Sequence, residues 1–296
     1  MSFIRAAGRT AIGGARNREN QDMFLISGRQ FCVADGHGKA GKNVAELVRA
    51  TVETAPPDMS FEELFAFADD NVRMMLDGSP ATTSSGTTLS LVKIDTDGTC
   101  RIAHVGDSEV RCYDSDEGEG TSWTHDHDPC CIREFHRIRN AVGEPNIVFY
   151  HPGCLFKRPV FVKKDGEWSM NSQGGFVKCN VRDEWMSYVF TEGGGYLAMT
   201  RAIGDFHMRS AGIISIPDVM VIEPLKSGTR AVVLASDGLW DSMHYKEVRA
   251  IVRHPECLAN VELAADRLME ATLTRGTELF GRELDNITLI VIYIQY

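Results

Sequence analysis

Acids stand at the ends of apolar runs in this sequence, where a strand would give way to a loop. Asp35 follows the apolar residues 31–34, and Asp237 closes a similar apolar run some two hundred residues later. Each acid is followed by a glycine, a pattern typical of a buried strand that ends in a turn. A third acid, Asp285, stands just before another apolar run. Carboxylates at three strand boundaries suggest one shared metal centre.

Divalent cations such as Mg²⁺ and Mn²⁺ take oxygen ligands and keep several water molecules. The carboxylates of Asp35, Asp237 and Asp285, with the backbone carbonyl of Gly36, would be enough to hold two such ions. If Asp35 joins ions about 3.5 to 4 Å apart, a water between them becomes a hydroxide near neutral pH and can attack by metal-assisted hydrolysis. His37 is then placed to donate a proton to the leaving oxygen.

Two other segments carry candidate ligands. Arg16 and Arg18 precede Asp22, and a guanidinium group matches two phosphate oxygens, although this segment is also typical of a solvated basic loop. Residues 125–128 alternate His and Asp, so they cannot all converge on one ion, and Asp126 or one histidine is the best candidate ligand. Asp107, at a tight turn, is predicted to be structural.

Periodicity predicts the elements that position these residues. We expect helices at residues 43–54, 61–76, 132–140 and 261–274, and strands at 23–26, 87–94, 100–105, 110–113 and 287–294. Ser60 and Glu63 form a predicted capping box. The three strands between residues 87 and 113 are predicted to form an antiparallel meander. Residues 143–195, called the insertion below, are predicted to form loops and short hairpins in a folded flap.

Composition limits the function classes. The chain has 296 residues, 43% of them apolar, which predicts one large domain over residues 1–296 that carries the insertion. Its net charge of -10 argues against nucleic acid or an anionic membrane as a partner, and no apolar run reaches the ~20 residues needed for membrane insertion. The eight cysteines are scattered, which favours reduced thiols in the cytoplasm or nucleus. The sequence does not indicate an oligomeric state.

Eight short segments occur in an order that resembles one family. They are 18–22, 33–38, 85–88, 105–108, 126–127, 200–205, 236–241 and 285–286. Together they resemble the Mg²⁺/Mn²⁺-dependent protein serine/threonine phosphatases of type 2C. The resemblance implies an α+β fold, a four-layer αββα sandwich of two antiparallel sheets flanked by helices, here with an enlarged flap. It also implies that phosphorylated proteins are the substrates, as in signalling.

The resemblance also implies roles for single residues. Asp35 would bridge two ions, Gly36 would bind one through its carbonyl, and Asp237 and Asp285 would bind the other. By the same resemblance Asp22 would orient metal-bound water.

Two further roles come from the same resemblance. His37 would be the general acid, and Asp126, with Asp237, would hold a weaker third ion.

Three departures from the family pattern stand out. Asn17 occupies the place of the usual phosphate-binding arginine, between Arg16 and Arg18, so either arginine could serve. Lys39 replaces a glycine, and the insertion is longer than the usual flap. A catalytically silent, phosphatase-like scaffold that binds partners through the insertion is the main alternative to an active enzyme, and hydrolysis of small phosphoesters is a further one.

Overall fold

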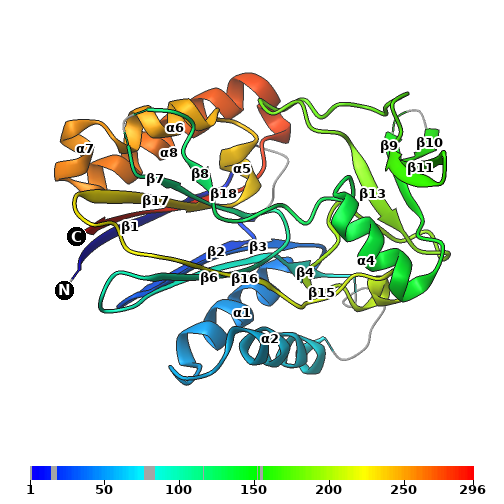
Figure 1. The fold of residues 1–296 in the computed structure, drawn as a ribbon, viewed down its shortest axis with the longest axis horizontal. Coiled ribbons are helices and arrows are strands. Elements are labelled where there is room, and N and C mark those ends of the chain that lie inside the picture. Colours follow the sequence, from blue (N-terminus) through cyan, green and yellow to red (C-terminus); the bar gives the residue numbers. More distant parts are fainter. Residues whose placement is uncertain (1, 15–18, 77–83, 116, 152, 154–155) are drawn as a thin grey trace.

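The computed structural model describes residues 2–14, 19–76, 84–115, 117–151, 153 and 156–296. Two antiparallel sheets stack face to face, and a layer of helices covers the outer face of each (Figure 1). This arrangement confirms the predicted four-layer αββα sandwich. That residues 1–296 form one domain stays a prediction.

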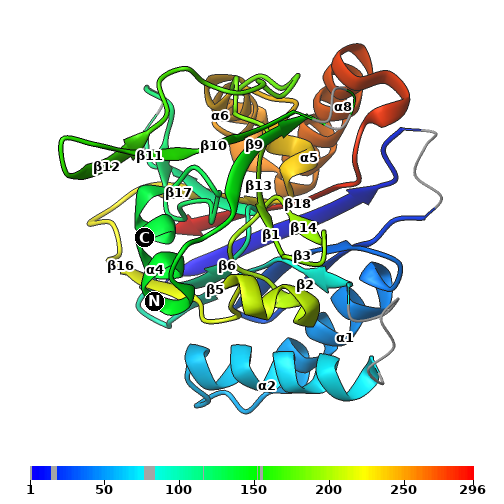
Figure 2. The same ribbon diagram turned by 90° about the vertical axis from the view of Figure 1, so that its right-hand side faces the viewer.

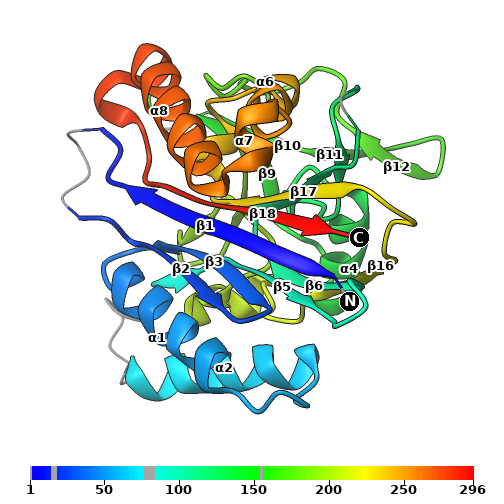
Figure 3. The same cartoon turned by 90° about the vertical axis from the view of Figure 1, so that its left-hand side faces the viewer.

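The first sheet has its strands in the order β1-β18-β17-β7-β8. Their bounds are β1 (Phe3–Ala11), β18 (Ile287–Gln295), β17 (Thr229–Ala235), β7 (Glu109–Tyr113) and β8 (Thr121–Ser122). The strand β18 lies between β1 and β17 and is antiparallel to both, so residues from opposite ends of the chain are neighbours (Figure 3).

The second sheet follows the order β15-β4-β3-β5-β6-β16, and β2 also pairs with β3. Its strands are β15 (Ile203–Gly204), β4 (Gly86–Thr87), β3 (Gln30–His37), β5 (Leu89–Ile94), β6 (Cys100–Val105), β16 (Asp218–Ile222) and β2 (Asp22–Ser27). The predicted strand 87–94 is therefore divided between β4 and β5. Central β3 carries Asp35 and His37 at its end, so the sheet fixes both residues.

Alternation along the strands builds a core on each side of a sheet. In β17, Val232 and Leu234 pack between the sheets, whereas Ala231 and Val233 pack against the helices. This period of two follows from the pleat of a strand. All four side chains are buried, which explains why the strand reads as a continuous apolar run.

The helices cover the two outer faces (Figure 3). The second sheet is covered by α1 (Gly41–Thr54) and α2 (Phe61–Met75), and the first by α5 (Asp237–Trp240), α6 (Tyr245–Val252), α7 (Pro255–Ala259) and α8 (Val261–Phe280). Ser60 and Glu63 form the predicted capping box at the start of α2. Among the described residues, no helix is long and apolar enough to cross a membrane.

The predicted meander is wrong for its third strand. The strands β5 and β6 are antiparallel neighbours, but β7 pairs with β17 in the other sheet. The turn at Gly106, whose φ is 95°, lets the chain cross between the sheets instead of folding back. A short turn is compatible with both paths, so local sequence could not distinguish them.

The described residues of the insertion pack on one end of the sandwich (Figure 2). Its strands are β9 (Ile147–His151), β10 (Phe156–Pro159), β11 (Phe161–Lys164), β12 (Glu167–Met170) and β13 (Ser187–Phe190), with β14 (Tyr196–Leu197) following. Phe149 and Phe161 pack in a core with Phe135 of the helix α4 (Ile132–Val142) and Met208 of the short helix η1 (Phe206–Ala211). A 3₁₀ turn, η2 (Gly281–Glu283), precedes β18.

A buried ion-pair cluster joins α4 to the segment before β15. Arg201 forms a fork with Glu134, in which its Nη2 lies 2.6 Å from Oε1 and its Nε lies 3.0 Å from Oε2. Arg137 Nε donates to the same carboxylate at 2.8 Å. Burial alone would raise the pKa of Glu134, but the two arginines more than offset it and lower the pKa from 4.5 to about 2.

We expect Glu134→Gln to lower the free energy of unfolding by about 3 kcal/mol near neutral pH, because the buried guanidinium of Arg201 and the half-buried one of Arg137 lose their counter-charge. The carboxylate has a folded pKa of about 2 and an ordinary pKa of 4.5, so its contribution is complete above pH 4.5 and is lost as the pH falls through about 2. Urea unfolding across this range measures the difference. The exposed Glu144→Gln is the control, and a Glu134→Gln effect that does not shrink with falling pH would contradict the assignment.

Candidate metal centre and active site

Asp22 and Asp35 face each other across two neighbouring strands. Asp22 is the first residue of β2 and pairs in register with Asp35 of β3. Like charges directly opposite one another in an antiparallel pair repel, and Asp22 is only 2% exposed. The sequence places these acids thirteen residues apart, and the hairpin between them brings the carboxylates to one point.

Asp237 and Asp285 reach the same place from the first sheet. Asp237 begins the short helix α5 directly after β17, and Asp285 lies just before β18. A Cβ atom on Gly238 would come within 2.1 Å of the Asn286 carbonyl oxygen, so the backbone next to Asp237 is in close contact with the backbone next to Asp285. The glycine that follows Asp237 is therefore required by contact with the segment that carries Asp285.

Hydrogen bonds tie the two sheets together beside these acids. The Ser236 hydroxyl donates to Asp22 Oδ2 at 2.8 Å, and the Thr288 amide donates to Ser236 Oγ at 3.0 Å. The Gln21 amide donates to Asn286 Oδ1 at 2.8 Å. Ser236 and Asn286 belong to the family-like segments. Ser236 fixes the Asp22 carboxylate of the opposite sheet, and Asn286 fixes the backbone next to it.

Burial and mutual repulsion disfavour charge on these carboxylates. Burial raises the pKa of Asp35 well above its ordinary value, and Asp22, Asp237 and Asp285 raise it further. Burial raises the pKa of Asp22 to about 6, although the hydrogen bond from Ser236 opposes the shift. The pKa of Asp237 is also raised, mainly by burial and partly by Asp285. The cluster therefore favours positive charge close by.

The donor set fits divalent cations. Asp22 Oδ1 and Asp237 Oδ1 are buried and lack a hydrogen-bond partner within the described part of the chain. A cation with oxygen ligands would satisfy such atoms and relieve the repulsion. At Gly36 a Cβ atom would lie 2.4 Å from the Gly41 carbonyl oxygen, so this position admits only a bare backbone next to Asp35. Asp35, Gly36, Asp237 and Asp285 stay predicted ligands.

Asp107 belongs to the same electrostatic cluster, which its turn signal did not reveal. Burial raises its pKa, and its charge in turn raises the pKa values of Asp35 and Asp237. The turn that carries the chain from one sheet to the other therefore also delivers a further acid to the centre.

His37 is held by Asp205, a contact that no local sequence pattern indicates. Its Nε2 lies 2.6 Å from Oδ2 of Asp205, which is 1% exposed. Burial lowers the pKa of His37, but Asp205 more than compensates, so the net shift is upward. The arrangement favours an imidazolium with a fixed orientation, as a proton donor requires.

The backbone around Asp205 is shaped to make this contact. Asp205 has φ of 47°, in the left-handed region that a non-glycine residue seldom adopts, and Gly204 before it has φ of 88°. A Cβ atom on Gly86 would lie 2.1 Å from the Asp205 carboxylate. The position of the Asp205 carboxylate therefore explains why two family-like segments carry glycine, at Gly86 and at Gly204.

The predicted phosphate-binding arginines, Arg16 and Arg18, lie outside the described residues. A different cation, Lys178, comes from the insertion. Its burial would lower its pKa, yet Asp241, Glu184 and Asp107 together raise it. A charged amine thus lies beside the acidic cluster, and no local sequence pattern indicates it. Lys39, the departure next to the His-Gly pair, is exposed.

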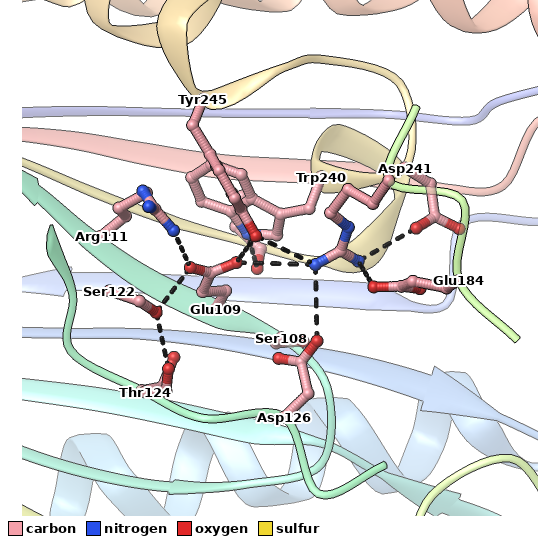
Figure 4. Close-up of polar contacts among 12 residues, drawn as sticks. Ser108, Glu109, Arg111, Ser122, Thr124, Asp126, Glu184, Trp240, Asp241 and Tyr245 are labelled. Carbon is pink, nitrogen blue, oxygen red and sulfur yellow. Dashed lines mark hydrogen bonds and ion pairs between the residues drawn. The ribbon is translucent and has the colours of Figure 1, made fainter. Parts of the chain in front are cut away.

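The His-Asp loop distributes its side chains to separate places, as the alternation predicts. Asp126 Oδ2 lies 3.4 Å from Nη1 of Arg182, an arginine of the insertion. Figure 4 shows Asp126 with Glu109, Glu184, Asp241 and Tyr245 around this contact.

His127 belongs to a different cluster. Its ring stacks on that of His104 with centroids 4.5 Å apart, and both histidines lie near Asp218, close enough for a metal ion by distance alone. However, Asp218 is already paired with Arg133 and with Arg201, whose Nη1 lies 2.9 Å from Oδ1. Two guanidinium groups at the carboxylate disfavour a cation there.

Comparison with known proteins decides the family. A model of the family described as protein phosphatase 2C matches residues 14–147 and 170–279. The chain belongs to the protein phosphatase 2C family. The first matched segment contains Asp22 and Asp35 and the second contains Asp237, whereas Asp285 lies just beyond the second. The gap between the segments falls within the insertion.

Curated relatives support this membership over most of the chain. Protein phosphatase 1L of Bos taurus is 24% identical over 277 residues, covering 88% of this chain and 63% of its own length. Probable protein phosphatase 2C 32 of Oryza sativa subsp. japonica is 28% identical, covering 90% of this chain and 57% of its own length. This chain therefore spans about 57% to 63% of the length of these relatives.

Solved structures share the fold. The serine-threonine phosphatase 2C of Toxoplasma gondii superposes with a TM-score of 0.70 at 19% identity, covering 99% of this chain and 95% of that one. The catalytic domain of the phosphatase PstP, solved in complex with two manganese ions, superposes with a TM-score of 0.60 at 19% identity, with both chains covered completely. At this identity the likeness establishes the sandwich of antiparallel sheets and helices.

We expect Asp35→Asn to have opposite effects on stability with and without metal. In chelator, the substitution should raise the melting temperature, because it removes one of several buried, mutually repelling carboxylates. With saturating MnCl2, the wild type should gain stability and the variant should not, because bound ligand stabilises the folded state. Thermal unfolding in both buffers, with the exposed Asp58→Asn as control, tests this. Equal manganese stabilisation of both proteins would contradict a role of Asp35 in binding.

Proposed function

We propose that this protein is a metal-dependent serine/threonine phosphatase that removes phosphate from phosphoserine and phosphothreonine in proteins. The observation that carries the proposal is the convergence of Asp22, Asp35, Asp237 and Asp285 at one end of the sandwich, next to an imidazole held by an acid. Family membership supports the same reaction. The proposal includes phosphoprotein substrates, a signalling role and a reducing compartment, the cytoplasm or nucleus. Seven described cysteines are free thiols, which supports that compartment.

The acidic residues have two proposed roles, metal binding and the orientation of water. Asp35, Asp237, Asp285 and the carbonyl of Gly36 would hold two Mg²⁺ or Mn²⁺ ions, which supply a hydroxide near neutral pH and neutralise charge on the phosphoryl oxygens. Asp22 is fixed by Ser236 and would accept a hydrogen bond from water at this centre.

Two further roles concern the substrate. His37 would give its proton to the leaving serine or threonine oxygen while Asp205 holds the ring. Arg16 or Arg18 would bind the phosphate.

The alternative is a silent phosphatase-like scaffold, and one observation favours it. Large apolar side chains are exposed on the insertion, among them Phe156, Met170 and Val177. Such side chains are suited to contact with a partner protein. A scaffold of this kind would bind partners without turnover, so an assay of hydrolysis separates the two functions.

We expect the wild type to hydrolyse a phosphothreonine peptide in MnCl2 and to lose this activity in excess chelator. Asp35→Asn and Asp237→Asn should each lower kcat/KM at least about a hundredfold, because each removes a carboxylate of the centre. Phosphate release measures the rate, and Asp58→Asn is again the surface control. Activity that survives either substitution would overturn the two-ion centre. A wild type that is inactive on every phosphopeptide while it binds Mn²⁺ would favour the scaffold.

The role of His37 has a test in the leaving group. We expect His37→Ala to lower the rate of hydrolysis of a phosphoserine peptide about a hundredfold. The rate with p-nitrophenyl phosphate should fall much less, because a good leaving group needs no proton. Asp205→Asn should show the same pattern at smaller size, since it frees the imidazole without removing it. Equal losses on both substrates would exclude general-acid catalysis by His37.

A further inference from the structure

An arginine of the insertion lies within the acidic rim of the metal centre. Nη2 of Arg182 lies 3.1 Å from Asp241 Oδ1 and 3.0 Å from Glu184 Oε1. Nη1 lies 3.4 Å from Asp126 Oδ2 and 3.7 Å from Glu109 Oε2. The guanidinium thus contacts carboxylates from four separate segments, and its side chain is only 13% exposed.

The backbone of the insertion is fastened beside this contact. The amide of Val181 donates to the Asp241 carbonyl oxygen at 3.0 Å. The Asn180 side chain donates to Asp241 Oδ1 at 2.9 Å and to Glu184 Oε2 at 3.1 Å. Since Asn180 and Val181 are both bonded to Asp241, the backbone next to Arg182 is fixed to the rim as well as the Arg182 side chain.

The charges around Arg182 require a cation at this place. Glu109 has its own partner in Arg111, at 2.8 Å. Within the described part of the chain, Arg182 is the ion-pair partner of both Asp126 and Asp241. Removing the guanidinium would leave Asp126 and Asp241 without their ion-pair partner. The amine of Lys178 lies near Asp241, but its single charge cannot balance both carboxylates.

Asp126 is the residue that the family resemblance assigns to a weaker third ion. In this structure, its carboxylate and that of Asp241 already hold a guanidinium, and a dication beside Arg182 would be repelled. The resemblance implies that Asp126 shares that ion with Asp237, but its carboxylate is already paired with a guanidinium, so Asp126 does not fit a third ion. We infer that Arg182 is a built-in cation that replaces a third divalent ion and fixes the insertion to the rim of the metal centre.

A cleft gives solution ions access to this place. It has a volume of about 740 Å³ and is lined by Asp126, Arg182, Glu184 and Tyr245, among others. Truncation of Arg182 would open the carboxylates to this cleft. Mn²⁺ could then occupy the site, because carboxylate oxygens and water are suitable ligands for it.

The test counts manganese ions bound to the full chain, by equilibrium dialysis against MnCl2 followed by elemental analysis. Arg182→Ala should bind one more ion per chain than the wild type, and Arg182→Ala with Asp126→Asn should lose that ion again. Arg182→Lys keeps the charge and should bind as many ions as the wild type. If Arg182→Ala gains no ion while its thermal unfolding stays cooperative, the inference is wrong.

Asp126→Asn alone provides a second test that does not depend on the stability of Arg182→Ala. It should leave the wild-type ion count unchanged, and a count that falls by one would show that an ion displaces Arg182. The inference rests on the proposed metal centre for its location, yet its readout is a difference between variants. A wild type that binds no manganese would refute the proposed function, whereas an unchanged count in Arg182→Ala would refute this inference.

Discussion

The site depends on the opposition of Asp22 and Asp35 across one antiparallel pair of strands. Two carboxylates held face to face in a buried setting are unfavourable unless positive charge or protons offset them. Apolar packing on both faces of β3 offsets this cost and holds Asp35 in place, because residues 31–34 pack alternately between the sheets and against α1 and α2. A rigid fold thus holds carboxylates together at one point, where they favour the binding of cations.

Both sheets contribute to this acidic centre, and polar contacts join them beside it. Ser236, on the first sheet, donates to Asp22 on the second, and Asn286 accepts from the chain next to Asp22. The insertion adds Lys178 and Arg182 on the outer side of the same cluster. Lys178 and Arg182 thus neutralise the acids at the rim. The acids at the centre are left to bind exchangeable metal ions.

Local sequence predicted the elements well and the chemistry in part. Asp35 and Asp237 could be singled out because an acid at the end of an apolar run is a local signal, and the capping box at Ser60 is equally local. Other features depend on contacts between residues that are distant in sequence. They are the pairing of β7 with β17, the contact of Asp205 with His37 and the ion pairs of Arg182. Such pairings depend on tertiary packing, which periodicity does not encode.

The position of β18 between β1 and β17 has a consequence for synthesis on the ribosome. The first sheet cannot close until its last strand has been translated, although β1 emerges first and must wait without its partner. Long-range pairing of this kind folds slowly, and an unpaired strand edge is open to association with other chains. Asp22 meets its partner Ser236 at the same late stage, so a nascent chain has no assembled metal centre before the sandwich is complete.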